Sequence, residues 1–290
     1  MLQQPGPGDL GRFRCAMPQS DCTVITRQGH NGLGYRVLRV SDHSTSSFFF
    51  AEFYVKDLET GATNPKGKPR ILKETAATAW VDGGDGLGAT VGNFCMDLAI
   101  KKAKESGIGW VAAKGSNHFG MAGWWAQRAE KSGYIGMAFT NSSPLLVPTR
   151  SKDGALGTNP IAMAAPASGG DSILVDMSSS AVAMGKVEVK IHEGKPLPPG
   201  WAMGPDGKMT HDPQVAFDSG RLYPLGGVEE TSGYKGYCLS AMNEVFCSSL
   251  SGKSPATLGR DKTWRASKPR PGVRCHRPWL LRAWLRRTPG

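Results

Sequence analysis

Residues 108–144 read IGWVAAKGSNHFGMAGWWAQRAEKSGYIGMAFTNSSP, and this stretch decides the fold class. The apolar run 108–113 predicts a short strand, and 122–131 predicts a helix that ends near Gly133. A second strand is predicted over 134–140. Strands that alternate with helices through short polar loops indicate an α/β protein whose helices cover a sheet.

The same alternation continues on both sides of this stretch. Along 90–106, Val91, Cys95, Leu98 and Lys102 recur on one helical face. The further predicted elements are a strand over 78–81, a glycine-rich turn over 83–88, a helix over 90–106 that Gly107 ends, a strand over 173–175 that leads into Asp176 and a serine-rich helix start, and an apolar helix over 237–250.

Three zones of the 290-residue chain differ in pattern. Residues 51–252 carry the α/β alternation and are predicted to form one compact core. Residues 1–50 show little hydrophobic periodicity, and 253–290 are rich in Arg, Trp and Pro. Both end segments are therefore predicted to be poorly ordered or loosely attached.

Positive charge is concentrated at one end of the chain. The formal net charge is +11, and residues 253–290 hold eleven Lys and Arg against one acidic residue, so the rest is nearly neutral. A basic tail can bind nucleic acid or anionic lipid, or it can simply be solvated. Because aromatic residues are not interleaved on a structured face, no nucleic acid is expected as a partner. No membrane is expected either, because no apolar run of about 18 residues is present.

The cysteines suggest neither a metal site nor a disulfide framework. No C-x-x-C pair and no histidine at zinc-ligand spacing accompanies them, so no metal is expected. Three of them lie among apolar residues, as small core side chains do. This usage is typical of a reducing compartment, and a cytoplasmic location is expected. The cysteines are Cys15, Cys22, Cys95, Cys238, Cys247 and Cys275.

Gly84-x-Gly86-x-x-Ala89 follows a predicted strand and precedes a predicted helix, the context of a dinucleotide-binding turn. Such a turn brings the backbone close to a pyrophosphate. The acidic residue expected about 20 residues on, for the ribose hydroxyls, is replaced by Lys114. A plain glycine-rich turn is the other interpretation, and a Rossmann domain is the alternative architecture.

Two candidate sites follow strands. In Ser116-Asn117-His118-Phe119-Gly120, His118 could pass the proton that accompanies hydride transfer, and Asn117 could orient the ring or a substrate hydroxyl. The other interpretation is a structural histidine. Ser142, in Thr140-Asn141-Ser142-Ser143-Pro144, could bind a cofactor or could close a turn.

Two further candidates lie closer to the C-terminus. Asp176, followed by Met177 and Ser178, could accept hydrogen bonds from ribose hydroxyls, or could cap the next helix. Lys235, between Gly233 and Gly236, could reach a phosphate or carboxylate, or could be a solvated turn residue.

Taken in order, these motifs resemble the type-2 malate/L-lactate dehydrogenase family, which includes ureidoglycolate and sulfolactate dehydrogenases. The likeness covers roughly residues 52–252, and seven ordered motifs make it specific. The motifs are VDGGDGLG, GSNHFGMAGWWA, GMAFTNSSP, GTNPIAMAAP, VDMSSSAVAMGK, LPPGWAMGPDGKMTHDP and GYKGY.

The resemblance implies a fold and a chemistry. It implies an α/β dehydrogenase core on a mixed sheet, not a classical Rossmann fold, and a homodimer with sites near the subunit interface. It implies hydride transfer between NAD or NADP and a small 2-hydroxy acid or 2-oxo acid. By the same resemblance, His118 matches the catalytic histidine, and the cofactor-binding residues are Ser142, Asp176, Met177, Ser178 and Lys235.

The chain departs from the family pattern at both ends. The family's Ser-His-Gly-x-x-Arg motif supplies a proton-transfer histidine and a carboxylate-binding arginine, but the matching positions hold Ser46 and Phe50. His43 lies nearby without the rest of the motif. Beyond Gly252 the family motifs give way to the basic tail, so the fold is expected to carry non-family N- and C-terminal segments.

Three hypotheses follow for the function. The first is an NAD(P)-dependent dehydrogenase of 2-hydroxy acids such as malate or lactate, active as a homodimer. The second is a catalytically impaired isoform or paralogue that binds the cofactor or pairs with an intact subunit. The third is a nucleic-acid- or membrane-associated protein that uses its basic tail.

Overall fold

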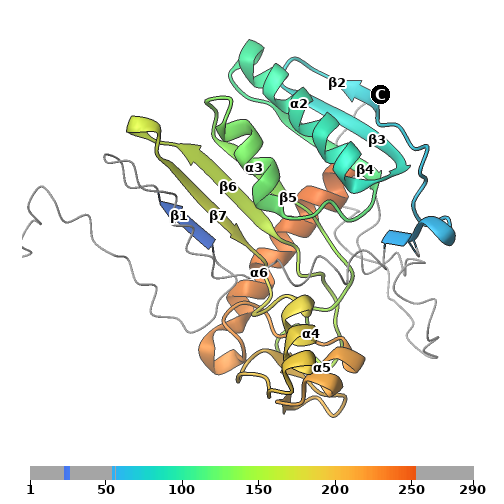
Figure 1. Cartoon of the computed structure of the whole chain (residues 1–290), viewed down its shortest axis with the longest axis vertical. Coiled ribbons are helices and arrows are strands. Elements are labelled where there is room, and N and C mark those ends of the chain that lie inside the picture. The colour runs from blue at the N-terminus through green and yellow to red at the C-terminus, as the bar shows by residue number, and fades with distance from the viewer. Residues whose placement is uncertain (1–22, 27–53, 56, 253–290) are drawn as a thin grey trace, which may run out of the picture.

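A computed structural model describes residues 23–26, 54–55 and 57–252 of the chain. Its helices and strands form two sheets with covering helices and a smaller lobe (Figure 1). The two terminal segments predicted to be poorly ordered lie outside the described residues, apart from the short strand β1 (Thr23–Thr26). No helix in the described part of the chain is long and apolar enough to cross a membrane.

The first sheet has the order β2-β3-β4 and contains both kinds of pairing. β2 (Arg70–Glu74) is antiparallel to β3 (Thr78–Gly86), and β3 is parallel to β4 (Trp110–Ser116). The crossover between the parallel strands is α2 (Gly88–Ser106), which ends at Gly107 in the left-handed conformation. The predicted strands and helix are confirmed here, and the sheet is mixed, as the resemblance implies. The predicted glycine-rich turn over 83–88 is wrong, because β3 continues through a register shift to Gly86, which pairs with Ser116, and α2 begins at Gly88.

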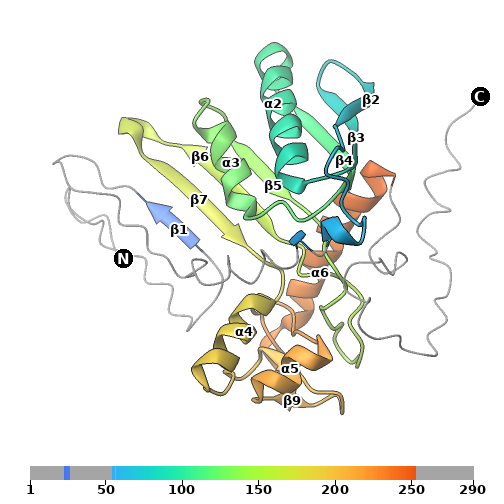
Figure 2. The ribbon, with the colours of Figure 1, turned by 45° about the vertical axis from the view of Figure 1, so that its right-hand side comes forward.

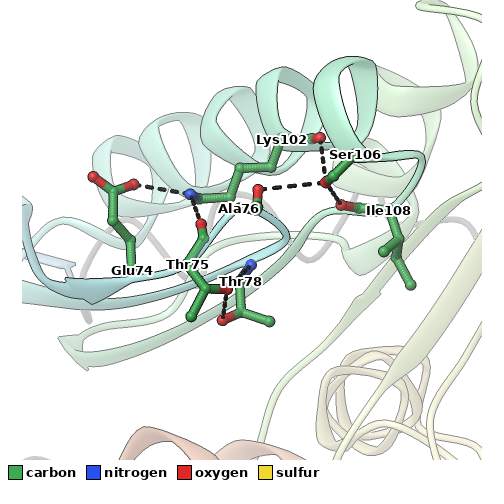
Figure 3. A network of polar contacts seen from close by, with 7 residues as sticks. All are labelled: Glu74, Thr75, Ala76, Thr78, Lys102, Ser106 and Ile108. Atoms are coloured by element: carbon green, nitrogen blue, oxygen red, sulfur yellow. Dashed lines mark hydrogen bonds and ion pairs between the residues drawn. The ribbon is translucent and has the colours of Figure 1, made fainter.

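A buried lysine fastens α2 to the edge of this sheet. Lys102 is only 6% exposed, and its Nζ donates to Glu74 at 2.9 Å and to the carbonyl of Thr75 at 2.6 Å (Figure 3). Ser106, one turn later, donates to the carbonyl of Lys102 at 2.9 Å. The lysine that the sequence places on the apolar face is therefore buried with its charge paired.

The second sheet has the order β1-β7-β6-β5, and every neighbouring pair is antiparallel. α3 (Ala122–Glu130) covers one face of it (Figure 1). The strands other than β1 are β5 (Gly136–Phe139), β6 (Ile161–Pro166) and β7 (Ser172–Met177). The shared core is made of small side chains around one tryptophan: Ala122, Trp125, Ala126, Ala138, Ala162, Ala164 and Leu174.

The small lobe, residues 182–222, lies beside the two sheets (Figure 2). Its core is Val182, Val187, Leu197, Trp201, Ala202, Ala216 and Leu222. Its elements are α4 (Met184–Glu193), β8 (Ala202–Met203), β9 (Met209–Thr210) and α5 (Pro213–Ser219).

α6 (Gly233–Glu244) connects this lobe to the first sheet (Figure 2). It continues as a π-helical turn, Val245–Ser249. There, Phe246 packs on Trp110 with ring centroids 5.6 Å apart, and Trp80 Nε1 donates to the carbonyl of Ser251 at 2.7 Å. The predicted helix over 237–250 is confirmed, although it begins earlier.

Three further sequence interpretations are wrong. Asp176 is not at a helix start but inside β7, and the next helix begins only at Met184. Lys235 is not in a turn but in the first turn of α6. The alternative Rossmann architecture fails because only β3 and β4 are parallel among the described strands.

Candidate active site

His118 lies in the loop between β4 and α3, as the sequence predicts, and it reaches solvent. The loop packs closely on the start of α2. A Cβ atom on Gly88 would lie 2.2 Å from the carbonyl oxygen of His118 and 2.3 Å from that of Asn117. Only glycine permits this approach, so Gly88, the first residue of α2, supports the histidine loop.

The Asn117 side chain ties the loop to an earlier part of the chain. Its Nδ2 donates to Asp57 at 2.7 Å and to the hydroxyl of Thr63, and its Oδ1 accepts from the backbone N–H of His118 at 2.8 Å. Thr63 is fully buried. The described contacts of Asn117 therefore hold the loop backbone and not the imidazole ring.

Tyr54 contacts the imidazole directly. Its hydroxyl lies 2.5 Å from Nδ1 of His118. Burial lowers the pKa of His118 below its ordinary value, and the carboxylate of Asp57 opposes this effect. Burial raises the pKa of Tyr54, and Asp57 raises it further. The pair is therefore a neutral imidazole beside a protonated phenol at neutral pH.

Asp176 meets the histidine loop at the beginning of α3. Its Oδ2 accepts from the backbone N–H of Gly123 at 2.8 Å, while the N-cap residue Met121 makes no side-chain cap. A Cβ atom on Gly123 would lie 2.7 Å from this oxygen, so glycine allows the contact. Asp176 thus caps the helix that follows His118 and lies at the same helix end as the histidine.

Ser142 is joined to the serine-rich segment through Thr158. The hydroxyl of Ser142 accepts from the backbone N–H of Thr158 at 3.0 Å and lies 3.1 Å from its side-chain oxygen. The carbonyl of Thr158 accepts from the backbone N–H of Ser179 at 2.8 Å. Ser178, next to Ser179, pairs its hydroxyl with that of Ser180 at 3.0 Å, and Met177 is the half-buried last residue of β7.

The start of α6, which carries Lys235, packs through Gly236 on Leu225, which contacts the same segment. The backbone of Leu225 donates to the carbonyl of Ser179 at 2.9 Å, and a Cβ atom on Gly236 would lie 2.2 Å from the carbonyl oxygen of Leu225. The side chain of Lys235 is exposed. The structure therefore brings the segments of Ser142, Ser178 and Lys235 together around Ser179.

Metal sites and cavities are the other features in the described part of the chain that bear on function. No group of three or more His, Cys, Asp or Glu side chains is placed to hold a metal ion there. A cavity of about 300 Å³ contains none of the predicted site residues. Its lining is Val147, Pro148, Thr149, Arg150, Ser151, Lys152, Met203, Gly207, Tyr223, Pro224, Gly227, Val228 and Glu229.

Sequence comparison places the chain among known dehydrogenases. The sequence model of the family described as malate/L-lactate dehydrogenase matches residues 40–280. The chain belongs to this family. The match extends beyond the quoted motifs at both ends.

Curated relatives agree with this membership. The chain is 46% identical over 200 residues to a malate dehydrogenase of Pyrococcus horikoshii, an overlap of 69% of this chain and 55% of the relative. It is 40% identical over 192 residues to an L-sulfolactate dehydrogenase of Methanocaldococcus jannaschii, covering 66% of this chain and 54% of the relative. This family member thus spans little more than half the length of the relatives it matches.

Solved structures show the same fold. The malate dehydrogenase of Entamoeba histolytica superposes with a TM-score of 0.69 at 34% identity, covering 72% of this chain and 60% of that one. The Pyrococcus horikoshii malate dehydrogenase gives a TM-score of 0.63 at 42% identity, covering 71% and 56%. The α/β core with a mixed sheet is therefore that of the malate/L-lactate dehydrogenases.

Sequence reasoning missed four residues that this family member places around the candidate site. Tyr54 and Asp57 lie in none of the quoted motifs. Asn159 lies within the GTNPIAMAAP motif, and Glu244 ends α6. For Asn159, a polar residue inside a mostly apolar motif was the available signal, whereas Glu244 carried none because α6 holds other polar residues.

Proposed function

We propose that this chain is an oxidoreductase that transfers hydride between NAD or NADP and a small 2-hydroxy acid or 2-oxo acid such as malate or lactate. The observation that carries the proposal is the contact between Tyr54 and His118, at a strand–helix junction, in a member of this family. The names of the relatives support the substrate class, since they include malate and sulfolactate dehydrogenases.

His118 would move the proton that accompanies the hydride. Its Nδ1 faces the Tyr54 hydroxyl, so proton exchange with a substrate would use Nε2. A hydroxyl can both donate and accept. When Nδ1–H donates to Tyr54, Nε2 can accept the proton of a 2-hydroxy acid. When His118 is cationic, Nε2–H can donate to the carbonyl oxygen of a 2-oxo acid.

The residues around Ser179 and Asp176 fit a nicotinamide nucleotide. They combine a carboxylate and hydroxyls for ribose with an exposed lysine for a phosphate, and a cradle of close backbone contacts holds them. Asp176, Met177, Ser178, Ser142 and Lys235 would hold the nucleotide. When bound, the nicotinamide supplies or accepts the hydride.

Impaired catalysis is the second candidate function. Ser46 and Phe50 stand where the resemblance expects the proton-transfer histidine and the carboxylate-binding arginine, although these positions lie outside the described residues. A chain of this kind would bind cofactor or pair with an intact subunit without efficient turnover.

We further propose a homodimer located in the cytoplasm. The family resemblance supports the dimer, and the scattered cysteines support the reducing compartment. Light scattering of the purified chain at several concentrations measures its oligomeric state. A monomer at micromolar concentration would contradict it.

One preparation can test both candidate functions. NADH and NADPH affinity is measured by fluorescence titration, and turnover is measured with malate, lactate and their 2-oxo acids. We expect detectable cofactor binding with turnover far below a typical value of about 10 s⁻¹. His118→Gln should lower any turnover by about 10²–10⁴-fold and leave cofactor affinity nearly unchanged.

His211→Gln is the matched control, because Nδ1 of His211 contacts the carbonyl of Leu197 in the small lobe. It should retain both affinity and turnover. If neither nucleotide binds the wild-type chain, the proposed function is wrong. Turnover near 10 s⁻¹ would instead favour the intact enzyme over the impaired isoform.

A further inference from the structure

Glu244 is a buried acid that the proposed proton transfer does not use. It is the last residue of α6 and is 6% exposed. Its Oε1 accepts from Nδ2 of Asn141 at 3.1 Å and from the hydroxyl of Ser248 at 2.6 Å, and its Oε2 accepts from Nδ2 of Asn159 at 3.0 Å. Donors on both oxygens compensate the cost of burying a carboxylate.

Asn159 links Glu244 to Ser142, because its side chain hydrogen-bonds to both residues. It is completely buried, and its Oδ1 accepts from the backbone N–H of Ser142 at 3.0 Å. Its carbonyl accepts from Nδ2 of Asn243 at 2.7 Å. Its φ of +34° lies in the left-handed region that residues other than glycine rarely adopt, so surrounding contacts must hold it there.

The π-helical turn after α6 adds Ser248 to these contacts. It brings Ser248 back onto Glu244, and the amide of Asn141 also donates to the hydroxyl of Ser248 at 3.1 Å. Burial raises the pKa of the neighbouring Cys247 thiol to about 12, with Glu244 adding to the effect and the backbone of Asn141 opposing it. Departures from α-helical geometry of this kind occur frequently at functional sites.

Ser142 and Asn159 also pack closely against Gly157. A Cβ atom on Gly157 would lie 2.4 Å from Oδ1 of Asn159 and 2.5 Å from the hydroxyl of Ser142. Ser142 is therefore packed against Gly157, and Asn141 donates to the α6 carboxylate.

We propose that Glu244 is a positioning residue that, through Asn141 and Asn159, fixes the Asn141–Ser142 segment in the conformation that receives the nicotinamide nucleotide. The inference rests on the proposed function, because that function gives Ser142 its role at the cofactor. Glu244 itself touches neither substrate nor cofactor in this proposal.

Glu244→Gln tests the role with little change of shape. One acceptor oxygen becomes an NH₂ donor that faces the NH₂ donor of Asn141 or Asn159. Loss of a hydrogen bond to a charged group corresponds to about tenfold or more in an equilibrium. We expect the Ser142 amide to exchange hydrogen about tenfold faster in the absence of cofactor, and NADH or NADPH to bind about tenfold more weakly.

Lys102→Ala is the control for general destabilisation, because it removes the buried contacts of Lys102 with Glu74 and Thr75 at the β2-β3-β4 sheet. It should lower stability without changing the local exchange of Ser142 or the affinity for cofactor, both measured where every variant is folded. A conservative Glu244→Asp, which keeps two acceptor oxygens, should recover part of the affinity.

The outcomes separate the two proposals. Unchanged Ser142 exchange in Glu244→Gln, or faster exchange with unchanged cofactor affinity, would overturn the positioning role alone. A wild-type chain that binds neither nucleotide would overturn the proposed function and the cofactor role together, while the exchange measurement would still decide whether Glu244 holds the segment.

Discussion

The surroundings of His118 set the direction of its pH response. Burial lowers the pKa of His118 below the ordinary value of 6.5, and Asp57 opposes this without reversing it. We expect the imidazole resonances, assigned by their loss in His118→Gln, to titrate with a midpoint below pH 6.5. A midpoint at or above that value would contradict the description of the site.

The same pKa shift makes a prediction about stability. The imidazole of the unfolded chain binds a proton near pH 6.5, and that of the folded chain binds one only at lower pH. The neutral His118 therefore stabilises the folded state fully above pH 6.5, and this stabilisation is lost as the pH falls below that value. Urea unfolding at pH 7.5 and at pH 5.5 should therefore show a larger acid-induced loss for the wild type than for His118→Gln.

At the scale of single residues, the sequence predicts the polar loop but not the partners of its side chains. His118 follows a strand and precedes a helix, and both features are local. Its contact with Tyr54 spans 64 residues, so no local pattern reveals it. Asp176 shows the same limit, because a capping residue is recognisable beside its own helix but not when it caps α3 from β7.

Among the elements, α2 owes its attachment to one buried lysine. Lys102→Ala would leave the carbonyl of Thr75 and the carboxylate of Glu74 without their shared donor. We expect a loss of roughly 1–3 kcal/mol in the free energy of unfolding, measured by urea denaturation. Lys101→Ala, on the exposed side of the same helix, should change it by less than about 0.5 kcal/mol. Equal effects of the two substitutions would show that the buried contact contributes nothing.

A clear hydrophobic period predicted α2, whereas β2 and β6, which lack one, were missed. The helix over 90–106 has an apolar face and a glycine stop, and both are present in α2. β2 is exposed at every position, so it lacks the alternation that marks a strand. β6 is rich in alanine, whose strand preference is low, and it forms a strand because its neighbours β5 and β7 pair with it on both sides.

For the whole molecule, the Trp80 side chain in β3 hydrogen-bonds to Ser251 near the end of the described core. Trp80→Phe removes the donor to the carbonyl of Ser251 and keeps an aromatic ring beneath Lys114. We expect a loss of about 1 kcal/mol in the free energy of unfolding. Trp124→Phe is the control, since Trp124 is 57% exposed on α3. A loss no larger than that of the control would mean that the contact does not stabilise the fold.

The arrangement of the sheets follows from pairings that local sequence does not encode. The alternation of strands and helices predicts an α/β protein, but the order β1-β7-β6-β5 joins strands from distant parts of the chain. Only the family resemblance distinguishes the mixed sheet from a parallel one, because both give the same succession of helices and strands.

The Trp80–Ser251 contact also bears on how the protein is made. Its two residues are 171 positions apart, and ribosomes add about 5–20 residues per second, so the indole waits roughly 10–30 seconds for its acceptor to be synthesised. β2, β3, α2 and β4 are all complete early in that interval. The first sheet is therefore synthesised long before Ser251, and its contact with Ser251 can form only after the end of the core has been made.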